Sequence, residues 1–186
     1  EGGQNVLTGC AKKMYEFSLE YYDRELNRRK DLDASINLPL TIIGILITGN
    51  TYIAKDLFPI QSFCNINFRH FLMLIFFLLI ILTTAYLTKS YNNFYKGFKY
   101  RNIGNYKELR EYQNKVIDYN GRINDPKKNI DFETKIIDKF VDIAENHCTI
   151  NDKRSYDLYI AKTMILFTIA TTLLNYIILI FKNSLL

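Results

Sequence analysis

Aromatic and basic side chains alternate in one stretch of the sequence, SYNNFYKGFKYRN at residues 90–102. Aromatic faces stack on nucleobases and cations neutralise phosphates, so this composition is suited to a nucleotide or a single-stranded oligonucleotide. The same residue types also anchor a helix where it leaves a membrane, because Tyr, Lys and Arg favour the water–lipid interface. Both interpretations are open from the sequence. The candidate ligand-binding residues are Tyr91, Tyr95, Lys96, Lys99 and Arg101.

The rest of the sequence lacks the patterns typical of catalysis. It contains no Gly-rich phosphate loop, no nucleophile elbow and no His-Glu-x-x-His motif. His147 and Cys148 are adjacent, and neighbouring residues on a helix point about 100° apart, which makes them a poor pair for one site. The three cysteines form no short-spaced pair, which argues against a zinc site or a disulfide framework. We therefore expect a protein that is not an enzyme and carries no metal or cofactor.

Three apolar blocks dominate the chain, at residues 38–54, 71–87 and 158–181. A helix needs about 20 apolar residues to cross a membrane, so the second and third blocks meet that length with their flanks and the first is marginal. Buried helices of a soluble protein are the alternative. That alternative is weak for the second block, FLMLIFFLLIILTTAYL, because it is apolar on all sides. The pattern predicts three transmembrane helices.

The distribution of Lys and Arg predicts the orientation of these helices. Six Lys and Arg residues lie in residues 1–37 and fourteen in 88–157, against two in 55–70 and Lys182 alone in the tail. Because basic residues accumulate on the cytoplasmic side, the N-terminus and residues 88–157 are predicted to be cytoplasmic. The loop 55–70 and the C-terminus are then on the opposite side.

Helical spacing outside the apolar blocks predicts two further features. Met14, Phe17, Tyr21 and Leu26 recur at the spacing of an amphipathic helix before the first block. Residues 106–119 and 132–148 show similar patterns on either side of turn signals at Asn120-Gly121 and 124–126, which predicts a helical hairpin.

Polar residues inside the apolar blocks mark the faces where the membrane segments meet protein or water, since polar groups in lipid are costly. Thr and Gly residues share one face of the first block, and Thr and Asn residues share one face of the third, whereas the second block has no such face. We expect the second helix to face lipid and the other two to present these faces to each other or to other copies. Close helix packing is one interpretation and a pore lining in an oligomer is the other. The candidate pore-lining residues are Thr41, Thr48, Thr51, Thr171 and Asn175.

The predicted fold is an all-α polytopic membrane protein with three transmembrane helices and a cytoplasmic helical hairpin. Seven segments are predicted along the chain. The three transmembrane helices are at 38–54, 71–87 and 158–181, a cytoplasmic amphipathic helix is at 1–37, and a cytoplasmic helical region is at 88–157. An external loop is at 55–70 and a tail is at 182–186.

Several short strings resemble a group of bacterial membrane proteins. They are YY at 21–22, LNRRK at 26–30 and LPLT at 38–41, and later ENH at 145–147, NDKRS at 151–155, LY at 158–159 and AK at 161–162. The layout and these strings resemble the transmembrane effectors of anti-phage defence operons, of the SLATT type and the Hailong membrane effector. The resemblance implies a homo-oligomer in the bacterial inner membrane, encoded beside a nucleotidyltransferase-like enzyme and controlled by its nucleotide or oligonucleotide product.

We therefore expect a gated, ion-conducting membrane effector, because a subunit with three spans is too small to enclose a pore alone and needs a ring of copies. The alternative is a non-conducting anchor or scaffold that recruits a cytoplasmic partner. A toxin that disrupts the membrane constitutively is a third possibility.

Overall fold

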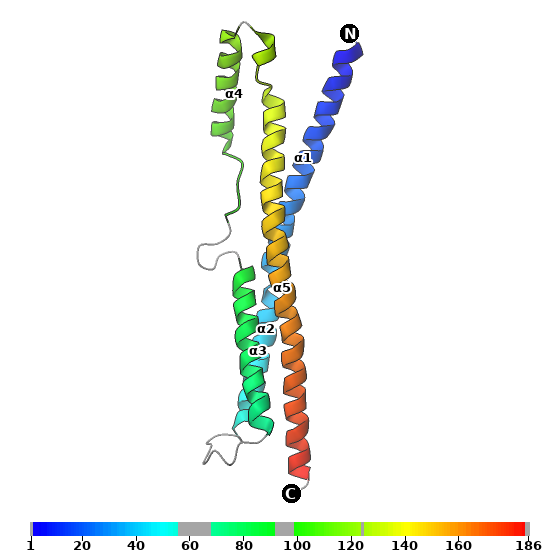
Figure 1. Cartoon of the computed structure of the whole chain (residues 1–186), viewed down its shortest axis with the longest axis vertical. Helices are drawn as coiled ribbons and strands as arrows, with labels where there is room; N and C mark the ends of the chain where they lie inside the picture. The colour runs from blue at the N-terminus through cyan, green and yellow to red at the C-terminus, as the bar shows by residue number, and fades with distance from the viewer. Residues whose placement is uncertain (1, 56–67, 92–98, 124, 185–186) are drawn as a thin grey trace. The chain divides into compact units, whose positions relative to one another are not determined.

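The structure is a computed structural model that describes residues 2–55, 68–91, 99–123 and 125–184 (Figure 1). These residues form helices and connecting segments without any strand. The chain divides into two compact units, which are considered separately: unit 1 is Glu1–Lys30 with Phe98–Asn151, and unit 2 is Asp31–Gly97 with Asp152–Leu186. Helices α1 (Gly2–Ala34) and α5 (Phe132–Ser184) contribute residues to both units.

The three apolar blocks all lie within helices. Among the described residues, three helical stretches are long and apolar enough to cross a membrane: Lys12–Ala54, Phe68–Ser90 and Pro126–Phe181. This confirms the prediction of an all-helical chain with three potential membrane spans.

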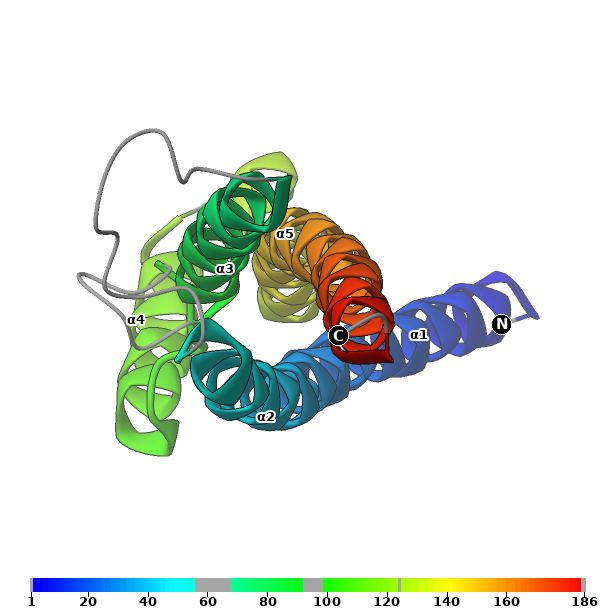
Figure 2. The ribbon, with the colours of Figure 1, turned by 90° about the horizontal axis from the view of Figure 1, so that it is seen from below.

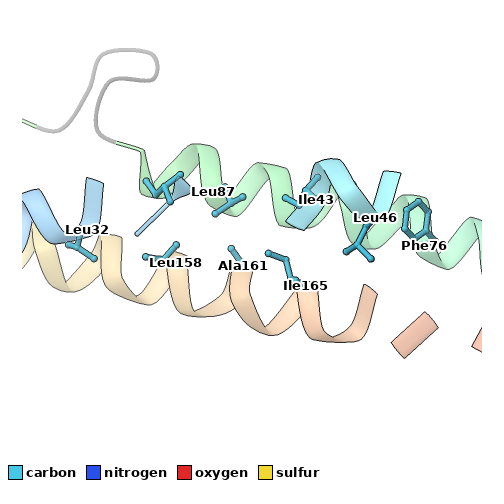
Figure 3. Packing of buried hydrophobic residues seen from close by; sticks show 9 residues of the cluster. Leu32, Ile43, Leu46, Phe76, Leu87, Leu158, Ala161 and Ile165 are labelled. Carbon is cyan, nitrogen blue, oxygen red and sulfur yellow. The ribbon is translucent and has the colours of Figure 1, made fainter. Parts of the chain in front are cut away.

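Unit 2 is built from three helices that pack side by side. Helix α2 (Asn37–Ala54) and helix α3 (Phe68–Ser90) lie against the second half of α5, and the view in Figure 2 shows the three around a common centre. Their inward faces share one apolar cluster with Leu32 of α1 and with Ile36 just before α2, seen from close by in Figure 3. Phe76 in this cluster is 1% exposed and Ala161 is fully buried. The cluster contains Leu32, Ile36, Ile43, Leu46, Phe76, Leu87, Leu158, Ala161 and Ile165.

Helix α3 has two different faces, one packed against the other helices and one exposed. Phe76 and Thr83 are buried against its neighbours. Phe71, Phe77 and Ile81 are exposed on its outer side, where large apolar side chains suit contact with lipid. The sequence did not separate these faces, because a helix that is apolar all round gives no sign of which side meets protein.

Unit 1 contains helix α4 (Tyr106–Arg122), the short 3-10 helix η2 (Pro126–Lys128) and the first part of α5. The Tyr112 and Phe132 rings are 5.9 Å apart, so α4 contacts the start of α5. The predicted turn at Asn120-Gly121 is wrong, because α4 continues through both residues. Asn120 instead closes the connection with its side chain, which donates to the Ile130 carbonyl and accepts from the Ile130 amide, both at 2.9 Å.

The N-terminal part of α1 also differs from its sequence pattern. Met14 and Phe17, which define the predicted apolar face, are 49% and 64% exposed. The buried residues of this part are polar, Ser18 and Glu25. This part of α1 contacts α5 through the Tyr15 and Tyr22 rings, which lie 5.9 and 5.6 Å from the Phe140 ring. It also contacts α5 through the hydrogen bonds between Glu25 and Asn151.

Helix α5 is continuous over 53 residues and joins two predicted segments, 132–148 and 158–181. The polar residues between these segments do not interrupt it, because the helix contains neither Gly nor Pro.

Asp131 caps the start of α5. Its carboxylate accepts from the Glu133 amide at 3.1 Å and from the Thr134 hydroxyl at 2.5 Å, which satisfies a backbone donor of the first turn. We expect Asp131→Ala to lower the free energy of unfolding by about 1 kcal/mol. The control is Asp138→Ala, because Asp138 is an exposed carboxylate of the same helix whose ion pair with Lys135 is worth well under about 1 kcal/mol. Thermal unfolding in detergent measures the stability of both variants. An equal loss of stability in the two variants would contradict the capping role of Asp131.

Candidate functional site

The end of the aromatic and basic stretch is held against α5 in unit 1. Arg101 donates its amide to Asn146 Oδ1 at 3.0 Å, and its Nη1 is 2.7 Å from both oxygens of Asp142. Its carbonyl oxygen is 2.6 Å from Nε2 of His147. Residues on two successive turns of α5 therefore position Arg101, and Asp142 already neutralises its charge.

His147 lies at the centre of this contact. Its side chain is fully buried, and the Tyr22 and Tyr100 rings lie 5.7 and 4.9 Å from the imidazole. A carbonyl oxygen only accepts, so Nε2 carries a proton and donates it to the Arg101 carbonyl. The imidazole Nδ1 has no hydrogen-bond partner within the described parts of the chain.

Asn151 joins α1 to the same stretch. Its Oδ1 accepts from the Tyr100 hydroxyl at 2.7 Å, and its Nδ2 donates to the carbonyl and to Oε2 of Glu25 at 2.9 and 3.1 Å. The Arg29 guanidinium lies 4.3 Å from the centre of the Tyr100 ring. We call Glu25, Arg29, Tyr100, His147 and Asn151 the Asn151 cluster. The cluster connects three chain segments of unit 1.

The structure describes three of the five candidate ligand-binding residues. Lys99 and Arg101 belong to unit 1 and are exposed, whereas Tyr91 follows α3 and belongs to unit 2. Tyr95 and Lys96 lie outside the described residues.

A groove between α4 and α5 was missed by sequence reasoning. It has a volume of about 520 Å³ and lies entirely within unit 1. Its lining mixes an aromatic ring, Tyr112, with charged side chains of both signs, including Lys139 and Glu108. Only the fold reveals it, because its two walls come from helices on either side of the loop between α4 and α5.

The candidate pore-lining residues of unit 2 differ in their exposure between α2 and α5. Thr41, Thr48 and Thr51 are exposed on α2, and each hydroxyl donates to a carbonyl of its own helix. Asn175 is fully buried, and Thr171 is half-buried. The Thr face of α2 therefore does not meet α5 within the chain, and contact with other copies, the second predicted alternative, stays a prediction. The residue that reaches α5 is Asn50, whose Nδ2 is 2.8 Å from Thr172 Oγ1.

A buried arginine connects helices at the other end of unit 2. Arg154 is fully buried, its Nε donates to the Ser90 carbonyl at 2.8 Å, and its Nη2 pairs with Asp33. The Ser90 hydroxyl returns a hydrogen bond to the Arg154 carbonyl at 3.0 Å. These contacts join the last turns of α1 and α3 to the middle of α5.

The sequence did contain a signal for these buried polar residues. His147, Asn151 and Arg154 follow one another by four and three residues, which places them on one face of a helix. The same face continues with apolar residues on both sides, such as Ile143 and Leu158. A polar run within an apolar face indicates buried hydrogen-bonded contacts rather than a solvated surface.

Comparison with protein families, curated proteins and solved structures finds no match for this chain. Its class is therefore defined by the fold: an all-helical membrane protein with three potential spans. Its two units each contain a buried polar cluster.

Proposed function

We propose that this chain is the subunit of an oligomeric, gated ion-conducting pore. The observation that carries the proposal is the outward direction of the small and hydroxyl-bearing face of α2. Thr41 and Thr48 are exposed, and a Cβ added at Gly44 would meet no atom within 4 Å. Such a face favours close approach of another helix or of water, and it is unlike the large apolar side chains that suit lipid.

The packing of unit 2 favours a pathway between copies. Its centre is filled by Phe76, Leu46 and Ile165, so the three helices of one chain have an apolar core. A ring of copies that turn α2 inward would place Thr41, Thr48 and Thr51 along the axis. In this arrangement α3 keeps its exposed phenylalanines toward lipid.

The gating signal is assigned to unit 1. We place its helices on the cytoplasmic side of a bacterial inner membrane, as the basic residues predict. The resemblance to anti-phage effectors supports a nucleotide or oligonucleotide made by a nucleotidyltransferase-like partner. Helix α5 contributes to both units, which offers a route for transmission. A ligand can shift gating only by binding the open and closed states with different affinities.

Liposome flux tests the proposal. The purified protein is reconstituted into vesicles loaded with a fluorescent ion indicator, and flux is followed with and without oligonucleotides. We expect Thr48→Leu to reduce flux at least about tenfold, because a longer apolar side chain would narrow and dry a pore at that face. The matched control is Ile47→Leu, an exposed neighbour on the same helix, which should conduct normally. Normal flux in Thr48→Leu would exclude this face as the lining.

The second candidate function is a non-conducting membrane anchor that recruits a soluble partner. The exposed Met14 and Phe17 of α1 favour it, because large apolar side chains next to charged ones suit a protein interface. An intact oligomer that passes no ions under any of these conditions would support the anchor over the pore.

A further inference from the structure

Three polar residues of unit 2 have buried side-chain atoms that lack a hydrogen-bond partner among the described residues. Arg69 is 4% exposed, Asn50 is 1% exposed and Asn175 is fully buried. The unmet donors are Nε and Nη2 of Arg69 and Nδ2 of Asn175. The unmet acceptors are the Oδ1 atoms of Asn50 and Asn175. None of these atoms has a partner among the residues that the structure describes.

The inward faces of all three helices carry these residues. Arg69 lies on the buried face of α3 with Leu72 and Phe76, at offsets of three and seven residues. Asn50 lies on the buried face of α2 between Leu46 and Ile53. Asn175 continues the buried face of α5 after Thr168.

The helix register places the three residues at one level. The bond from Asn50 to Thr172 fixes α2 against α5, and Asn175 is one turn further along. The bond from Arg154 to Ser90 fixes α3, which runs antiparallel to α5 (Figure 1). Arg69 lies 21 residues before Ser90, and Asn175 lies 21 residues after Arg154. With the same rise per residue in both helices, Arg69 and Asn175 are at the same height.

The charge of Arg69 has no counterpart nearby in the described part of unit 2. The carboxylates there are Asp31, Asp33, Asp152 and Asp157. Asp157 is 18 residues from Asn175, which corresponds to about 27 Å along a helix. Within the described residues, the buried charge of Arg69 is therefore not balanced, and burying a charge or a polar group without a partner is unfavourable.

We propose that Arg69, Asn175 and Asn50 form a binding site for a small inorganic monoanion of the halide class. The donors of Arg69 and Asn175 are suited to the anion itself, and a water in its shell can donate to Asn50 Oδ1. One guanidinium is balanced by one negative charge, whereas a dianion would leave a buried negative charge. The burial of Arg69 also favours a small ion over a lipid headgroup. The site holds one end of the three-helix unit together, opposite to the Arg154 contacts.

Thermal unfolding of the full-length protein in detergent tests the site, with chloride as the probe. The melting temperature is measured in sodium chloride and in sodium gluconate at equal ionic strength, because gluconate is too large for a buried site. We expect chloride to raise the melting temperature by at least about 2 °C, in a saturable way. Arg69→Gln should remove this shift. Lys55→Gln, which removes an exposed positive charge at the end of α2, should keep it.

A second variant keeps the test decisive if Arg69→Gln does not fold. Asn175→Asp places a carboxylate at the same height as Arg69, so that the chain itself supplies a negative charge in place of the anion. We expect this variant to fold and to melt at the same temperature in chloride and in gluconate. Equal melting temperatures of the wild-type protein in the two salts would overturn the proposal in favour of water alone. A chloride-dependent rise of the melting temperature that persists in both variants would also overturn the proposal. The measurement is independent of whether the protein conducts ions.

Discussion

Replacing Arg154 with Met is expected to destabilise the protein more than any other single change considered for unit 2. The substitution retains much of the side-chain volume but leaves the buried Ser90 carbonyl without its donor and Asp33 without its cation. Removing one partner of a buried ion pair typically costs about 3–5 kcal/mol. Because the Asp33 side chain is 41% exposed and water can solvate it, we expect a loss near the lower end of that range, about 3 kcal/mol.

The comparison that isolates this effect is Lys153→Met. Lys153 is the exposed neighbour of Arg154 on α5, so its replacement also removes a positive charge but breaks no buried contact. We expect a change within about 0.5 kcal/mol for this control. Adding Asp33→Asn to Arg154→Met should recover part of the loss, since the uncompensated carboxylate is then removed. A stability of Arg154→Met equal to that of the control would show that the buried pair contributes nothing.

Asn151→Leu is the change with the largest expected effect on unit 1. Leucine has the same number and branching of side-chain heavy atoms as asparagine but cannot donate to Glu25 or accept from Tyr100. The Glu25 carboxylate then stays buried with a bond removed, and such a loss costs about 1–3 kcal/mol per buried group and more for a charged one. We expect about 3 kcal/mol in total.

Hydrogen exchange separates this local effect from global unfolding. The amides of α5 near Asn151 and those of α1 near Glu25 should exchange faster in Asn151→Leu. Thr149→Leu is the matched control, because Thr149 is exposed and its hydroxyl bonds only to its own helix. Unchanged protection in α1 would mean that Asn151 does not hold this helix.

The sequence predicted the helices well and their contacts poorly. Long apolar blocks locate the spans because few other structures accommodate them. The predicted start of the helix at Tyr106 agrees with α4, and the Asn105 side chain caps it by accepting from the Glu108 amide. These features depend on local residues alone.

The faces that meet in space could not be predicted in the same way. The apolar residues Met14 and Phe17 are exposed, and the polar residues Glu25 and Asn151 are buried together. Hydrophobic periodicity assigns each residue by its own polarity, whereas a buried polar residue depends on a partner far away in the sequence. The outward direction of Thr48 and the inward direction of Asn50 illustrate the same point, since both are polar residues of one helix.

The register of α5 within unit 2 restricts how the length of this helix can change. Arg154 and Asn175 are both fully buried at a separation of 21 residues, which is about 5.8 helical turns. Inserting a single residue between them would rotate one relative to the other by about 100°, so the two ends could no longer pack against α3 together. Insertions or deletions of seven residues nearly preserve the phase. Evolutionary variation in chain length should therefore accumulate in the loops and avoid this stretch of α5.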